Sequence, residues 1–258
     1  MTLTVLGGSA AGVNTGAGCA GYLIDSALAQ FVLDLGPGTL QELRKHADFR
    51  RLAGIAISHL HLDHVLDLAA LRFALAYNPD PPPSKVPLWM PPDGDAFLRR
   101  FAWVFAEASK QAEFFHDYFE VKEYDPSTSV PIGDAVIEFT PTVHYVPCWA
   151  MRLAIPGSSG DLFYTADTGP AANLVSRAKG CAVVVAESTL LEASPEPYEA
   201  RGHLTAREAG ALARDAGART LVLTHMWEEL DFAAYRHEAE QVFDGRIVLA
   251  QPGVTIEW

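Results

Sequence analysis

Hydrophobic and polar positions along the chain form two kinds of segment. Short runs rich in Val, Ile, Leu and Phe, each closed by a glycine or a polar residue, predict β-strands. These strands are expected at residues 2–6, 31–35, 54–58, 136–140, 162–165, 182–186, 220–224, 246–250 and 254–258. Helical periodicity between them predicts helices at 38–46, 65–77, 93–111, 171–178, 206–216 and 232–243. This alternation is compatible with an α/β (α+β) fold.

Local signals define the ends of two helices. Thr205-Ala206-Arg207-Glu208 has the form of a capping box, and Gly217 follows the helix that this box begins. The proline-rich stretch 78–84 cannot continue the preceding helix, because proline lacks an amide donor and restricts its neighbours. We interpret it as an ordered connector rather than a domain linker.

The length of 258 residues suits a single domain, residues 1–258, and no internal repeat divides it. An aromatic-rich helical insertion is expected at about 79–126. Its rings belong to Trp89, Phe97, Phe101, Trp103, Phe105, Phe114, Phe115, Tyr118 and Phe119. Plain helix packing accounts for most of them, with a lid over a site or a dimer contact as the alternative.

Charge and cysteine usage narrow the class of protein. The formal net charge of -13 disfavours a general nucleic-acid-binding surface, which needs clustered Lys and Arg. Three widely spaced cysteines, Cys19, Cys148 and Cys181, make a disulfide framework improbable. The first eight residues lack a basic region and reach glycine too early for a signal peptide or a membrane span. We therefore expect a soluble, cytoplasmic protein without a membrane partner.

The run Ser58-His59-Leu60-His61-Leu62-Asp63-His64 carries the chemistry of the chain. It places three imidazoles and a carboxylate within six residues, directly after the apolar Ile55-Ala56-Ile57. Imidazole and carboxylate are ligands of zinc and similar divalent ions. Other polar residues that follow predicted strands are Asp34, Asp167 and His225. Because strand ends converge at one edge of a sheet, these side chains are expected to build one site.

The ordered set resembles the signature of metallo-β-lactamase-fold hydrolases, H-x-H-x-D-H followed by a later His, Asp and His. Here the later residues are His144, Asp167 and His225, and the match covers essentially the whole chain. The resemblance implies a four-layer αββα sandwich and two divalent metal ions, zinc first, with manganese or iron as alternatives. It places His59, His61 and His144 on one ion, Asp63, His64 and His225 on the other, and Asp167 between them. Asp63 would also orient or deprotonate the attacking hydroxide.

Two further motifs are similar to those of the ribonuclease Z and phosphodiesterase branch. They are Gly202-His203-Leu204-Thr205 and Ala186-Glu187-Ser188-Thr189. On that resemblance His203 contacts the scissile phosphate and protonates the leaving oxygen, and Glu187 holds His203 cationic. The alternative for His203 is a capping role before the next helix.

Two departures argue against a dedicated transfer-RNA nuclease. Only the short turn 156–160 stands between His144 and Asp167, where ribonuclease Z carries its substrate arm, and the first loop, residues 7–16, has no Lys or Arg. We therefore expect a metal-dependent hydrolase that cleaves a small phosphodiester, such as a cyclic nucleotide, by metal-bound hydroxide. A ribonuclease Z-like RNA endonuclease and a lactone, ester or thioester hydrolase are the alternatives within the family. A non-catalytic metal-binding sensor is the alternative from another class.

Several other residues have weaker assignments. Asp34 is interpreted as orienting a ligand rather than binding metal. Asp67 has either that role or one at the start of a helix. Cys148 and Trp149 are candidates for lining the pocket, and His116 is expected on the surface. The resemblance is compatible with a homodimer.

Overall fold

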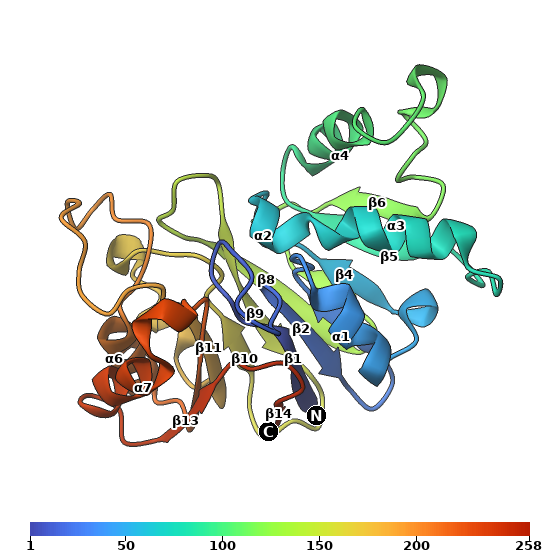
Figure 1. Cartoon of the computed structure of the whole chain (residues 1–258). Helices are drawn as coiled ribbons and strands as arrows, with labels where there is room; N and C mark the ends of the chain where they lie inside the picture. Colours follow the sequence, from blue (N-terminus) through green and yellow to red (C-terminus); the bar gives the residue numbers. More distant parts are fainter.

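The computed structural model describes residues 1–258, and two seven-stranded sheets form its centre (Figure 1). The first sheet has the order β14 (Thr255–Glu257), β1 (Thr2–Gly7), β2 (Gly21–Asp25), β3 (Gln30–Leu33), β4 (Gly54–Ala56), β5 (Val86–Met90) and β6 (Phe119–Glu123). The second has the order β13 (Arg246–Leu249), β12 (Thr220–Thr224), β11 (Val183–Glu187), β10 (Leu162–Tyr164), β9 (Trp149–Ala154), β8 (Ala135–Pro141) and β7 (Val130–Ile132).

Helices cover the outer face of each sheet. The α-helices are α1 (Thr39–His46), α2 (Leu62–Val65), α3 (Asp67–Tyr77), α4 (Gly94–Ala102), α5 (Val175–Ala178), α6 (Ala206–Ala216) and α7 (Phe232–Glu240). Short 3-10 helices lie at Phe49–Arg51, Ala108–Lys110, Pro170–Ala172 and Glu228–Leu230. Helices α1, α3 and α4 lie on the side of the first sheet, whereas α6 and α7 lie on the side of the second (Figure 1). None of these helices is both long and apolar enough to cross a lipid bilayer.

Three apolar clusters account for this layering. Phe31 and Leu33 of β3 pack with Ile137 and Leu153 of the second sheet, so one cluster fills the space between the sheets. Val32, which alternates with them along β3, points outward into a second cluster with the helices α1, α3 and α4. A third cluster joins the second sheet to α5, α6 and α7. The expected four-layer αββα sandwich is confirmed.

Parallel pairing determines where functional side chains can meet. Strands β3 to β6 run parallel to one another in the first sheet, and β10 to β13 do so in the second. The carboxyl ends of the parallel strands in each sheet therefore lie at one edge. The loops after β3, β4, β10, β11 and β12 leave from these ends and carry most of the predicted site residues, whereas His144 follows β8.

The sequence pattern missed five strands, β2, β5, β6, β7 and β9. The β9 sequence, WAMRLA, is rich in helix formers, yet its residues pair with both β8 and β10. The β6 sequence, FEVKE, has three charged residues out of five and lies at the edge of its sheet. Tertiary pairing decides both segments, because neither has a clear apolar alternation of its own.

The segment at about 79–126 differs from the expected helical insertion. It contains α4, which ends at Ala102 rather than residue 111, and it contributes the strands β5 and β6 to the first sheet. Most of its rings pack into the cluster beneath α3 and α4, as Phe101 does against Phe115 with ring centroids 5.7 Å apart. Plain packing therefore explains these rings, although Trp103 remains exposed.

A second correction concerns the helix expected at 171–178. Asn173 has a φ of 42°, and this left-handed residue divides the segment into a 3-10 turn and the four-residue α5. By contrast, the helix at 206–216 begins with the expected capping box and ends at Gly217 in the left-handed conformation.

Candidate metal centre

The predicted ligands come together where strands of the two sheets end. His59 and His61 follow β4, Asp63 and His64 lie in α2, and His144 follows β8. Asp167 and His225 follow β10 and β12. Three residues at these strand ends, Asp34, Ala166 and His225, have positive φ values of 55°, 50° and 59°. Such strained turns in non-glycine residues are typical of functional sites.

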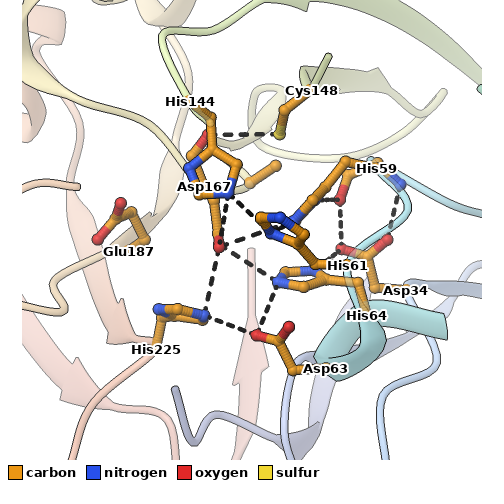
Figure 2. A network of polar contacts seen from close by, with 12 residues as sticks. Asp34, His59, His61, Asp63, His64, His144, Cys148, Asp167, Glu187 and His225 are labelled. Carbon is orange, nitrogen blue, oxygen red and sulfur yellow. Dashed lines mark hydrogen bonds and ion pairs between the residues drawn. The ribbon is translucent and has the colours of Figure 1, made fainter. Parts of the chain in front are cut away.

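One group of donors contains three imidazoles (Figure 2). His61 Nδ1 lies 3.2 Å from His59 Nε2 and 3.0 Å from His144 Nε2. Asp167 Oδ2 lies 3.8 Å from His59 Nε2 and 3.7 Å from His144 Nε2. The ring nitrogens therefore face one common point together with a carboxylate.

A second group contains His64, His225 and two carboxylates. His225 Nε2 lies 3.1 Å from Asp63 Oδ2 and 3.3 Å from Asp167 Oδ2. His64 Nε2 lies 3.3 Å from Asp167 Oδ1 and 3.5 Å from Asp63 Oδ2. Asp167 belongs to both groups and lies between them (Figure 2).

The protonation behaviour of three of the histidines and of both carboxylates suits metal binding. Burial lowers the pKa of His59, His61 and His144, so their rings are neutral and offer lone pairs. Burial raises the pKa of Asp63 and Asp167, but His64 and His225 outweigh it and hold the pKa of both carboxyls below the usual range. His64 Nε2 is buried and has no hydrogen-bond partner. An unpaired buried nitrogen beside facing lone pairs is the arrangement that a divalent cation satisfies.

Hydrogen bonds orient most of the ligand rings from behind. Thr189 Oγ1 lies 2.7 Å from His225 Nδ1, and the Gly202 carbonyl accepts from His144 Nδ1 at 2.9 Å. The Ser58 hydroxyl, which donates to Asp34, lies 3.0 Å from His59 Nδ1. In each case the second ring nitrogen is left to face the centre. The roles of Thr189, Gly202 and Ser58 are not predicted from the sequence, and only the Glu187-Ser188-Thr189 motif gives a signal for Thr189.

Asp34 acts through His64, as expected. It is fully buried and accepts from Ser58 N, Ser58 Oγ and Tyr164 Oη at 2.7 Å each, and from His64 Nδ1 at 2.8 Å. Burial lowers the pKa of His64, but Asp167 and Asp34 outweigh it and raise the pKa well above its usual value. Asp34 therefore holds the ring with Nε2 directed at Asp63 and Asp167.

His203 and Glu187 form a pair beside the second group. His203 Nδ1 lies 2.9 Å from Glu187 Oε1, and the His203 ring stacks on His225 with centroids 5.5 Å apart. The buried Glu187 also accepts from Thr168 N and Thr189 N at 3.0 Å each. Burial lowers the pKa of His203, but the bond and charge of Glu187 outweigh it and raise the pKa to about 9. His203 is thus an imidazolium at neutral pH.

Comparison with known proteins is consistent with this centre. The family model for the beta-lactamase superfamily domain matches residues 29–226. The chain belongs to the beta-lactamase superfamily. A Mycobacterium leprae protein, ML1173, is 31% identical over 100% of this chain and 88% of its own length.

Several of the similar proteins carry functional names, among them YhfI and ribonuclease Z. The probable metallo-hydrolase YhfI of Bacillus subtilis is 27% identical over the full length of both chains, and its crystal structure superimposes with a TM-score of 0.83, 25% identity and 99% coverage of each chain. Ribonuclease Z of Haloarcula marismortui is 25% identical over 98% of this chain and 96% of its own. Together with the donor groups, these names support metal-dependent hydrolysis as the activity of this superfamily member.

Other candidates lie away from the centre or support its structure. Asp67 accepts from the amide of Leu40 at 2.8 Å, so it caps the start of α1. Cys148 Sγ donates to the Asp167 carbonyl at 3.3 Å, and Trp149 packs at right angles to Tyr124. His116 lies in a turn, 2.8 Å from Asp95, and is partly buried rather than exposed on a helix as expected. None of these residues joins the donor groups.

Proposed function

We propose that the protein is a phosphodiesterase that hydrolyses a small phosphodiester, such as a cyclic nucleotide, at a centre of two divalent cations, zinc first. The observation that carries the proposal is the pair His203–Glu187, which lies against the ligand group at His225. A charged imidazolium in that position serves both to contact an anionic phosphate and to donate a proton. An enzyme that hydrolyses acyl compounds with weakly basic leaving groups has less need of such an acid.

The donor groups support our proposal for the remaining roles. His59, His61 and His144 would hold one cation, Asp63, His64 and His225 the other, with Asp167 shared. When bound, the cations supply a water-derived nucleophile at neutral pH and neutralise the charge of the phosphate. Asp63 accepts a hydrogen bond from the attacking water and sets its direction.

His203 completes the reaction on the opposite side of the phosphorus. Its Nε2 proton passes to the leaving oxygen, while its Nδ1–H continues to donate to Glu187. The ring is then neutral and can take up a proton from solvent for the next turnover. Glu187 is held by the backbone amides of Thr168 and Thr189, so the ring does not need to move during the transfer.

Substrate size follows from charge and from the short loops. The chain carries a net charge of -13, and β9 and β10 are joined by a short turn without a substrate arm. Binding of a long polyanion needs clustered Lys and Arg, and the first loop, residues 7–16, has neither. An RNA endonuclease is the second candidate, because ribonuclease Z matches nearly the whole chain.

A substrate panel with metal analysis tests the proposal. Purified protein would be assayed against bis-p-nitrophenyl phosphate, 2′,3′- and 3′,5′-cyclic nucleotides, precursor transfer RNA, lactones, thioesters and nitrocefin. We expect turnover of the phosphodiesters, with about two metal equivalents bound. Activity confined to lactones, thioesters or lactams would contradict the phosphodiesterase. Absence of both metal and turnover, also after metal addition, would favour a non-catalytic protein.

A further inference from the structure

Tyr145 is an exposed aromatic residue at the edge of the metal centre. It directly follows His144, and 54% of it is accessible to solvent. Its ring centroid lies 5.1 Å from that of His144 and 5.6 Å from that of His203. The ring is therefore a neighbour of the proposed proton donor, His203.

The Tyr145 ring is held in place from two directions. Its hydroxyl donates to Glu196 Oε2 at 2.7 Å, and the ring lies against the backbone of Gly202. A Cβ at residue 202 would come within 2.8 Å of this ring, so the close contact depends on glycine. An aromatic ring that is already immobilised loses little conformational entropy when a ligand stacks on it.

The exposure of Tyr145 contrasts with the packing of the side chains that follow it in the sequence. Trp149, the other aromatic side chain close to His144 in sequence, packs against the core and Tyr124. Cys148 is buried as well. Tyr145 instead leaves about half of its surface open beside His203, which is itself only partly exposed. A flat apolar group attached to the leaving oxygen would cover that surface.

We propose that Tyr145 forms the wall of the leaving-group subsite and that its ring stacks on the nucleobase of a cyclic nucleotide. The inference rests on the phosphodiesterase function proposed above and adds the chemical class of the leaving group. Bases stack on aromatic side chains with little dependence on sequence, because each base has a π-face. The ring selects nucleosides over sugars that lack a base.

The test compares two substrates with the same cyclic phosphodiester. One is adenosine 3′,5′-cyclic phosphate and the other is 1-O-methylribofuranose 3′,5′-cyclic phosphate, which has no base. The readout is the ratio of their kcat/KM values. Tyr145→Ala and Tyr145→Leu should lower this ratio by about tenfold, which corresponds to about 1.4 kcal/mol. Tyr145→Phe should preserve it, because the π-face remains.

Tyr198→Ala is the matched control. Tyr198 is 57% exposed and its hydroxyl donates to the Pro170 carbonyl, and it is not a member of the donor groups. Its loss should leave the ratio unchanged. An equal fall in kcat/KM for both substrates in Tyr145→Ala would show that Tyr145 only positions its neighbours. An unchanged ratio in Tyr145→Leu would show that the bulk of the side chain suffices. Either result overturns the stacking subsite. Failure of the wild type to hydrolyse either compound overturns the cyclic-nucleotide function itself, and this subsite with it.

Discussion

Replacing Asp34 with asparagine tests whether this buried carboxylate tunes the metal centre through His64. Oδ1 accepts from Ser58 N, and Oδ2 accepts from Ser58 Oγ, His64 Nδ1 and Tyr164 Oη. Asparagine tolerates the positive φ of 55° at this position, so the substitution adds little backbone strain. It changes the charge and turns one acceptor into a donor.

The magnitude follows from these four bonds. In the better orientation the amide oxygen replaces Oδ2, and the amide NH2 then faces the Ser58 N–H. The Ser58 N–H and the amide NH2 are then both buried donors without a partner, at about 1–3 kcal/mol each, and the remaining bonds lose their charge assistance. We expect Asp34→Asn to lower the free energy of unfolding by about 2–6 kcal/mol. Loss of a hydrogen-bonding partner behind a ligand histidine should also weaken metal binding about 10- to 100-fold.

Two measurements separate the effects. Urea denaturation of the metal-free protein gives the stability, and competition with a chelator gives the metal affinity. Asp67→Asn is the control, because Asp67 caps α1 and is not a member of the donor groups; it should cost about 1 kcal/mol of stability without a change in metal affinity. A metal affinity of Asp34→Asn within threefold of the wild type would refute the reasoning, whatever happens to stability.

Three further predictions concern catalysis. His203→Ala should slow poor leaving groups about 10²- to 10⁴-fold and activated p-nitrophenyl esters far less, with metal content unchanged; equal losses, or loss of metal, would refute the general-acid role. Because the pKa of His203 is raised from its usual 6.5 to about 9, the acid is protonated below that pH and is lost above it. Turnover of poor leaving groups should therefore fall as pH rises through about 9, and Glu187→Gln should move this fall to lower pH; a pH profile that Glu187→Gln leaves unchanged would contradict the pairing. Asp63→Ala should reduce both metal occupancy, measured by elemental analysis, and activity, whereas full metal occupancy in this variant would exclude Asp63 as a ligand.

Parts of the fold were readable from local sequence. The capping box at Thr205 to Glu208 satisfies amides within a single turn, so α6 began where predicted. Strands such as β11 and β12 are continuous apolar runs that fit a sheet covered on both faces. By contrast, β9 and β6 have no clear pattern of their own and became strands through pairing with their neighbours.

The candidate site divides in the same way. The spacing within His59 to His64 placed several donors in one short segment, and the family signature added His144, Asp167 and His225. Neither could show which ring nitrogen faces the centre, because that depends on Thr189, Gly202 and Ser58 behind the rings.

The sequence by itself determined the family, the donor set and the chemistry that such donors support, because residue type and short spacing are local properties. The tertiary structure decided how strands from two sheets bring those donors to one edge, and which way each ring points. It also decided that the ring of Tyr145 stays exposed beside His203. Contacts such as these join residues far apart along the chain, for example Tyr145 and Gly202, so only the folded chain defines them.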